Sequence, residues 1–134
     1  MGQPLFVFTD DGRGEPGVQT VYLQYTSGAT GAIPTALTRS AGFLSVVRTG
    51  TGVVDFILNN PAFKLLSWTA NVNPASYVFS AAGSGVNTLV DAVSAAIPKV
   101  TVTFRRGDTG AAVDTANGDI VVLQLQLKTV QLGA

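Results

Sequence analysis

The sequence contains no cysteine and no histidine among its 134 residues. Without cysteine the chain has no disulfide framework, no thiol nucleophile and no thiolate metal site. Without histidine it lacks the side chain that most often acts as general base or metal ligand near neutral pH. Ser-His-Asp and Cys-His chemistry and the usual zinc sites are therefore excluded. We expect a protein that is not an enzyme, with no catalytic residues, no metal and no cofactor.

Charge is also scarce, because charged residues make up only 12% of the chain and its eight basic and eight acidic residues cancel. A neutral chain creates no field that would attract nucleic acid or an anionic membrane. No apolar run approaches the roughly 18 residues that a membrane-spanning helix needs. We therefore expect neither nucleic acid nor a membrane as a partner.

Hydrophobic residues are plentiful, at 46%, and they occur in short runs separated by Gly, Asn, Pro and Ser. This pattern is typical of an antiparallel all-β domain. The chain is predicted to form one domain over 1–134, a β-sandwich or jelly roll of about eight strands. The predicted strands lie at 4–8, 18–25, 42–48, 53–58, 63–72, 77–79, 100–104 and 121–128.

The clearest hairpin runs from Gly42 to Leu58, where Gly50 and Gly52 can supply the positive φ values of a tight turn. The strict alternation of 100–104 and 121–128 predicts two half-buried strands, which we pair as a C-terminal hairpin. The segment 86–97 fits either a short helix or an irregular strand pair, and its spacing favours the helix slightly. In the strand 63–72, alternation places one apolar set on a single face: Leu66, Trp68, Ala70 and Val72.

Acidic residues offer only weak sites. Asp10, Asp11 and Glu15 share a loop of the kind that can hold calcium, but their spacing fits no EF-hand and Arg13 would repel the cation. We interpret them as a solvated turn. Two pairs of carboxylates could in principle act as in glycosidases, but no sugar-stacking cleft accompanies either pair: Asp55 with Asp91, and Asp108 with Asp114.

The outward positions of the predicted strands carry uncharged side chains where most proteins carry Lys and Glu: Tyr22, Gln24, Val122, Gln124 and Gln126. A surface of this kind with zero net charge favours association over repulsion. The Gly/Ala/Thr-rich loop Thr26 to Pro34 has almost no side chains able to form a core, so it is a candidate mobile arm or partner-contacting loop.

Two parts of the chain resemble a family of small virion proteins of tailed bacteriophages. In that family an Arg-Thr-Gly-Thr-Gly turn leads into an apolar strand, as Arg48 to Val54 does here. A Thr/Val strand, an Ala/Asp-rich loop and an alternating strand ending in Lys then follow, as in 100–104, 110–114 and 119–128.

The resemblance implies a capsid decoration (cement) protein on the capsid surface of a virion, made in the host cytoplasm. Such a protein would bind the major capsid protein and copies of itself, as a trimer or dimer. Termini and featureless loops can order on a partner by adding a strand to an exposed edge. We therefore expect contacts in the N-terminal arm 1–17 and the loop 26–41, and at the basic doublet. The expected contact residues are Leu5, Phe6, Phe8, Ala29, Ile33, Leu37, Arg105 and Arg106.

Other functions stay open at this stage. The chain could be another virion component, such as a tail-tube, connector or fibre-base protein. It could also be a carbohydrate-binding β-sandwich, for which Tyr22, Tyr25 and Trp68 are the plausible aromatic contacts. The doublet Arg105–Arg106 could meet a phosphate or an acidic partner, although such doublets more often pair with nearby carboxylates.

Overall fold

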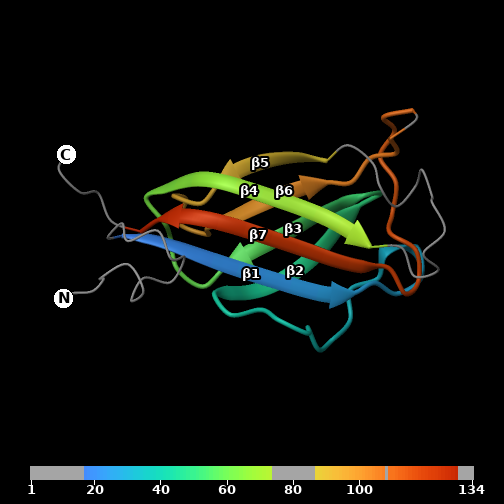
Figure 1. Ribbon diagram of the computed structural model, residues 1–134, viewed down its shortest axis with the longest axis horizontal. Helices are drawn as coiled ribbons and strands as arrows, with labels where there is room; N and C mark the ends of the chain where they lie inside the picture. Colours follow the sequence, from blue (N-terminus) through green and yellow to red (C-terminus); the bar gives the residue numbers. More distant parts are fainter. Residues whose placement is uncertain (1–16, 74–86, 108, 130–134) are drawn as a thin grey trace, which may run out of the picture.

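Seven antiparallel strands form two sheets in the computed structural model, which describes residues 17–73, 87–107 and 109–129 (Figure 1). The three-stranded sheet has the order β1-β7-β4, and the four-stranded sheet has the order β2-β3-β6-β5. Their bounds are β1 Val18–Thr26, β2 Phe43–Gly50, β3 Val53–Leu58, β4 Lys64–Asn73, β5 Thr88–Ala92, β6 Lys99–Thr103 and β7 Ile120–Lys128, with a short 3₁₀ turn at Ala29–Gly31. The all-β sandwich predicted from the sequence is confirmed.

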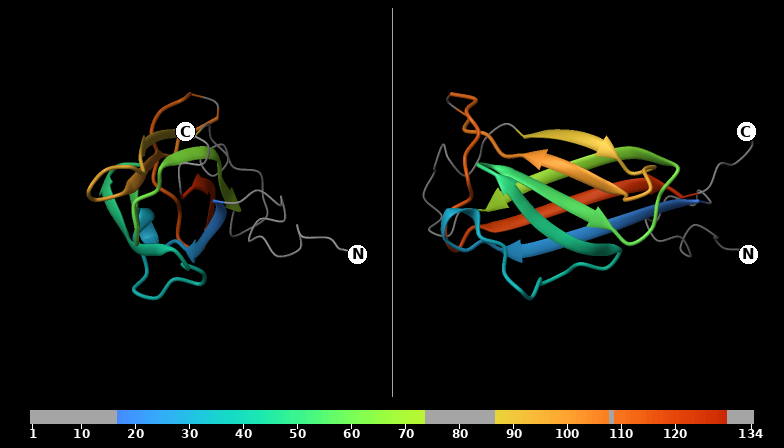
Figure 2. Two further views of the ribbon diagram at one scale, coloured as in Figure 1. Left: turned by 90° about the vertical axis from the view of Figure 1, so that its left-hand side faces the viewer. Right: turned by 180° about the vertical axis from the view of Figure 1, so that it is seen from behind.

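The two sheets lie face to face, and the hydrophobic core fills the space between them (Figure 2). Alternation along each strand supplies the core, because every second side chain points to the same face of a sheet. The central strand β7 shows this most clearly, since Val121, Leu123, Leu125 and Leu127 are all buried. On the opposite sheet Phe56 is fully buried and meets Phe43 edge to face, with ring centroids 6.5 Å apart.

Both seams of the sandwich are bridged by a few polar contacts. On one side the segment around Arg39 lies along β1, where the Gln24 N–H donates to the Arg39 carbonyl at 2.8 Å. The Thr38 N–H donates in turn to the Gln24 carbonyl. On the other side the Asn87 side-chain amide donates to the Ala70 carbonyl at 2.7 Å and so links the start of β5 to β4.

The predicted C-terminal hairpin is wrong in its pairing. The strands at 100–104 and 121–128 both exist, but they lie in different sheets. β6 pairs with β3 and β5, whereas β7 pairs with β1 and β4. Alternation specifies which face of a strand is buried and not which strand lies beside it, and the connection between them is long enough to cross from one sheet to the other.

The helix expected over 86–97 is also wrong. Thr88–Ala92 is an edge strand paired with β6, and the residues after it form a turn. Leu89 packs against the core, while Val90 points outward and is 65% exposed. An apolar residue on each face of one short strand imitates the spacing of an amphipathic helix, which is why the pattern misled.

A β-bulge in β4 corrects the face predicted for Leu66. The register with β7 shifts between Leu65 and Ser67, so Leu66 is turned away from the core and is 40% exposed. Leu65 packs against the core in its place, with Trp68, Ala70 and Val72 as predicted. The predicted strands at 4–8 and 77–79, and the turn with Asp10, Asp11 and Glu15, lie outside the described residues.

Truncation of one leucine in each environment tests this assignment. Leu125→Ala removes a fully buried side chain of β7, so we expect a loss of about 2–5 kcal/mol in the free energy of unfolding. Leu66→Ala, in the neighbouring strand, should cost less than about 1 kcal/mol because its side chain is exposed. Urea denaturation of both variants measures the difference. An equal loss in the free energy of unfolding for both variants would mean that the Leu66 side chain is buried, and it would contradict the bulge.

Candidate functional site

One end of the sandwich is built around the carboxylate of Asp114, which lies in the connection from β6 to β7. Asp114 accepts two hydrogen bonds from the Arg48 guanidinium, at 2.9 Å from Nε and 2.7 Å from Nη2. It also accepts a bond of 2.8 Å from the backbone N–H of Gly52. The carboxylate therefore joins the turn between β2 and β3 to a segment more than 60 residues later in the chain.

These hydrogen bonds determine the electrostatics of the pair. Arg48 holds the pKa of Asp114 below its ordinary value, mainly through the side-chain hydrogen bonds, and the Gly52 N–H lowers it further. Burial opposes both effects but is outweighed. Hydrogen bonding to Asp114 correspondingly raises the pKa of Arg48. The pair is charged at neutral pH, and it binds the two segments together.

Two further contacts hold the loop after β1 against the same connection. The hydroxyls of Ser27 and Thr115 are buried and 2.6 Å apart, and the Gly31 N–H donates to the Thr115 carbonyl. Gly31 has φ +72°, and a Cβ there would lie 2.9 Å from Oδ1 of Asp114. Hydroxyls and main-chain groups thus anchor the loop that the sequence predicts as either a mobile arm or a partner-contacting loop, although it contributes few apolar side chains.

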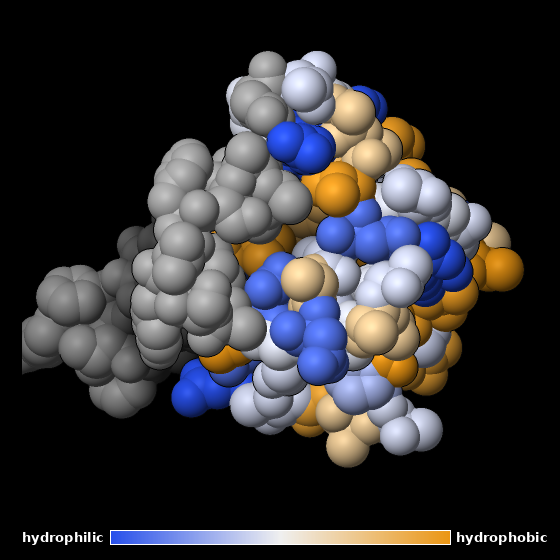
Figure 3. Space-filling view, turned by 90° about the vertical axis from the view of Figure 1, so that its right-hand side faces the viewer, coloured by the Kyte–Doolittle hydropathy of each residue, from blue (hydrophilic) through white to orange (hydrophobic). Residues whose placement is uncertain are grey.

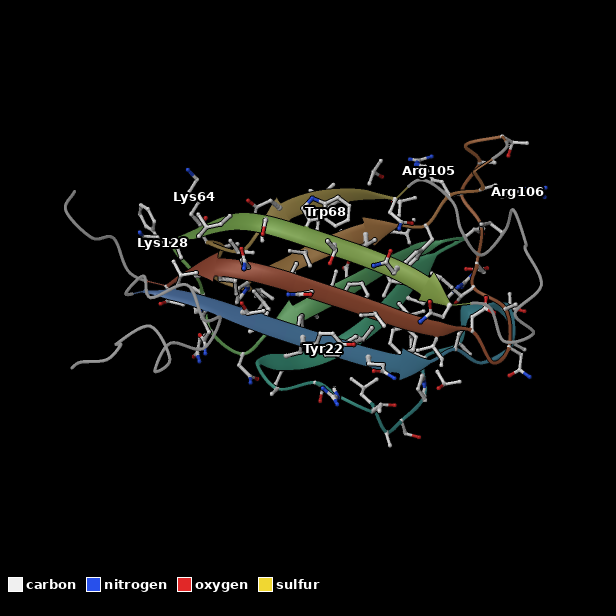
Figure 4. The ribbon with its side chains drawn as sticks, viewed as in Figure 1. Tyr22, Lys64, Trp68, Arg105, Arg106 and Lys128 are labelled. Carbon is white, nitrogen blue, oxygen red and sulfur yellow. The ribbon has the colours of Figure 1, made fainter. Side chains whose placement is uncertain are left out.

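The predicted contact residues separate into two groups. Ala29 is exposed at this end of the sandwich, and Arg105 and Arg106 project from the same end (Figure 4). Arg105 donates to the Gly110 carbonyl at 3.1 Å, and Arg106 has interactions of its own. Hydrophilic residues gather on this end when it faces the viewer (Figure 3). We call Ala29, Arg105 and Arg106 with the surrounding loops the loop end.

The other predicted contact residues do not join the loop end as exposed groups. Ile33 and Leu37 pack against the hydrophobic core. Leu5, Phe6 and Phe8 belong to the part of the chain that is not described. The two largest aliphatic side chains of the loop 26–41 are therefore packed inward and are not part of its exposed surface.

The outer face of the three-stranded sheet is polar and uncharged at its centre, as the alternation predicts. Ser67 donates to Gln126 at 3.0 Å across the sheet, and a shallow hollow beside them is lined by Ser67, Trp68, Thr69, Gln124 and Gln126. The Arg39 guanidinium lies 5.5 Å from the centre of the Tyr22 ring, a cation–π contact. Lys64 and Lys128 lie side by side at the far end of this face (Figure 4).

The aromatic residues considered for carbohydrate binding are not arranged as a platform. Tyr25 is buried in the core, and burial raises the pKa of its phenol well above the ordinary value. Trp68 packs partly against the core, and Arg39 lies over the Tyr22 ring. These three rings therefore do not present a shared exposed face to a sugar.

The carboxylates weighed as catalytic pairs have other roles. Asp55 accepts hydrogen bonds from Lys99 at 3.2 Å and from Thr101 at 2.6 Å, and Asp91 accepts the Val93 N–H at 3.0 Å. Asp114 is bound by Arg48, and its predicted partner Asp108 is outside the described residues. Within the described ranges, no three His, Cys, Asp or Glu side chains are grouped as a metal ion would need.

The outer face of the four-stranded sheet is the surface that sequence reasoning missed. Val47 and Val90 lie exposed on its two edge strands, and Ile57 and Val53 are partly exposed between them. The sequence feature that could have indicated this surface is the strand β3, Val53–Leu58, because apolar residues lie on both of its faces. For the same reason, alternation does not mark Val53 and Ile57 as surface residues.

Comparison with known proteins gives no relative, since no family model, curated protein or solved structure matches the chain. The helical content is limited to one 3₁₀ turn in the described part of the chain, and no helix there could cross a membrane.

Neutralising Asp114 tests the electrostatics of the loop end. Asp114→Asn keeps the shape but loses the charge, so we expect a loss of about 1 kcal/mol at pH 7. Because the folded-state pKa is lowered, this stabilisation is present above the unfolded pKa of about 3.9 and disappears as pH falls through the folded pKa. Unfolding free energies of both proteins across pH 2–7 measure it. A difference that does not change with pH would contradict the ionic role.

Gly52 provides a steric test of the same junction. It has φ +71°, and an added Cβ would lie 2.8 Å from backbone atoms of Phe104 and Val113. We expect Gly52→Ala to cost more than about 2 kcal/mol, since positive φ and backbone contact both oppose it. Gly50→Ala is the matched control, because nothing lies within 4 Å of its Cβ position. Thermal unfolding compares the two, and similar melting temperatures would refute the close packing.

Proposed function

We propose that the chain is a structural virion protein that decorates a tailed-phage capsid and stabilises it by binding across major capsid subunits. One observation supports the proposal most. Two of the segments that carry the resemblance, 48–54 and 110–114, are far apart in sequence and meet at the Asp114 carboxylate. These two segments thus form one structural unit.

The surface chemistry is consistent with binding of this kind. The outer face of the four-stranded sheet carries one charge of each sign, and that of the three-stranded sheet is uncharged at its centre. The loop end presents main-chain groups and small side chains from a well-anchored loop. A decoration protein needs many modest contacts, because symmetry and high local concentration on a shell multiply them. We assign contact with the major capsid protein to the loop end, and the mechanism is binding without chemistry.

Co-sedimentation with expanded shells of the major capsid protein from the phage that encodes the chain tests the proposal. We expect the wild type to sediment with the shells at saturable stoichiometry. The double variant Ala29→Glu with Arg105→Glu should bind at least about tenfold more weakly, a change of roughly 1.4 kcal/mol.

Lys64→Glu is the control, because Lys64 lies at the opposite end of the sandwich (Figure 4). It should sediment as the wild type does. Absence of wild-type binding would refute the decoration role, and a ring of five or more subunits in solution would favour a tail-tube or connector protein. Equal loss in both variants would refute the loop end as the contact.

A further inference from the structure

Three rows of side chains cross the outer face of the four-stranded sheet, and the strand register defines them. The central row runs Val47, Asp55, Thr101, Val90 from β2 to β5. The row on one side consists of Ser45, Ile57, Lys99 and Ala92. The row on the other side consists of Gly50, Val53, Thr103 and Thr88. We call these twelve positions the outer face.

Apolar side chains on this part of the molecule are open to solvent. Among the described residues six large hydrophobic side chains are exposed, and Val47 at 44% and Val90 at 65% belong to the outer face. Leu44, 69% exposed, lies in the β2 bulge beside Ser45, and Ile97, 68% exposed, lies in the turn before β6. Hydrophobic residues gather along the side of Figure 3 on which this sheet lies. Exposed apolar clusters mark interaction sites.

The charges of the outer face indicate what kind of surface can complement it. Its only two charged residues are Asp55 on β3 and Lys99 on β6, which form an ion pair at the centre. The face therefore has no net charge, and neither an acidic nor a basic surface would complement it. A second copy of the face carries one charge of each sign and can complement both.

Symmetry then fixes how two copies can meet. A two-fold axis parallel to the strands, between the two faces, places β2 opposite β5 of the second copy and β3 opposite β6. Val47 would then meet Val90 of the second copy, and Asp55 would meet the Thr101 and Lys99 positions. An axis perpendicular to the strands would instead set Asp55 against Asp55, which like-charge repulsion disfavours.

We infer that the outer face binds the same face of a second copy about a two-fold axis parallel to its strands. This inference makes specific the self-association expected from the sequence, and it depends only on the chain's own surface. The interface is isologous, so it closes at two copies and leaves the loop ends outside the contact.

The size of the face sets the strength of the dimer. Four strands about 4.8 Å apart and five residues along each cover only about 300 Å² of sheet. Standard interfaces bury about 800 Å² on each partner, so even with Leu44 and Ile97 the contact is small. The dimer should therefore dissociate on dilution, with a dissociation constant in roughly the micromolar range.

Light scattering after size-exclusion chromatography, over a concentration series, tests the pairing. The wild type should shift from monomer to dimer mass as concentration rises. Val90→Lys should weaken dimerisation at least about tenfold, as should Val47→Lys on the other edge strand, so that misfolding of either variant leaves a second one. Thr69→Lys is the matched control, because Thr69 is an exposed outward residue on the edge strand of the other sheet, and it should dimerise normally.

A charge exchange tests whether the charges of the two faces meet across the interface. Asp55→Lys and Lys99→Asp should each be monomeric alone, because each doubles one sign on the face. Their equimolar mixture should restore dimer mass, and circular dichroism should confirm that each variant is folded. A wild type that is monomeric at every concentration, a trimer, a dimer insensitive to Val90→Lys, or a mixture without heterodimer would each overturn the inference.

The two proposals fail separately. A monomeric wild type that still sediments with shells would refute the pairing alone. A dimer that responds to these variants but does not bind shells would refute the decoration role alone.

Discussion

The last passage of the chain between the two sheets, from β6 to β7, depends on the charged hydrogen bonds of Asp114. Between Phe104 and Asp119 the chain leaves the four-stranded sheet and enters the three-stranded one with no regular strand to guide it. Asp114 ties this passage to the β2–β3 turn through Arg48 and Gly52, and Thr115 ties it to the loop after β1. Hydrophobic burial stabilises each sheet against the other, but these polar contacts determine how the chain passes between them.

Much of the fold could be predicted because alternation reports burial directly. β7 follows the pattern residue by residue, and β1 follows it from Val21 to Tyr25. The β2–β3 hairpin was predicted from Gly50 and Gly52, of which Gly52 has the expected positive φ and Gly50 does not. Which strands lie side by side could not be predicted from the sequence, since a half-buried strand has the same alternating pattern in either sheet. The helix expected at 86–97 failed for a related reason: Val90 is apolar and faces outward, so the period of two was hidden.

The surfaces were predictable only where polar residues marked them. Gln124 and Gln126 identified the outer face of the three-stranded sheet, because they alternate with buried leucines. On the opposite sheet Val53 and Ile57 gave no such contrast. Likewise, the contact between Arg48 and Asp114 could not be predicted, because the two residues are 66 positions apart. Such a contact depends on the tertiary fold and not on any local sequence pattern.

The bridged seams have a consequence for how the protein behaves when crowded. A chain with zero net charge has little electrostatic repulsion between copies, so unpaired strand edges would invite edge-to-edge growth into fibrils. The backbone of Thr38 and Arg39 forms hydrogen bonds with the backbone of Gln24 on the free side of β1. On β4 the Ala70 carbonyl accepts a hydrogen bond from the Asn87 side-chain amide. A few backbone and amide hydrogen bonds thus take up groups at Gln24 and Ala70 that edge-to-edge growth would use, which makes these two edges less regular templates for a neighbouring copy.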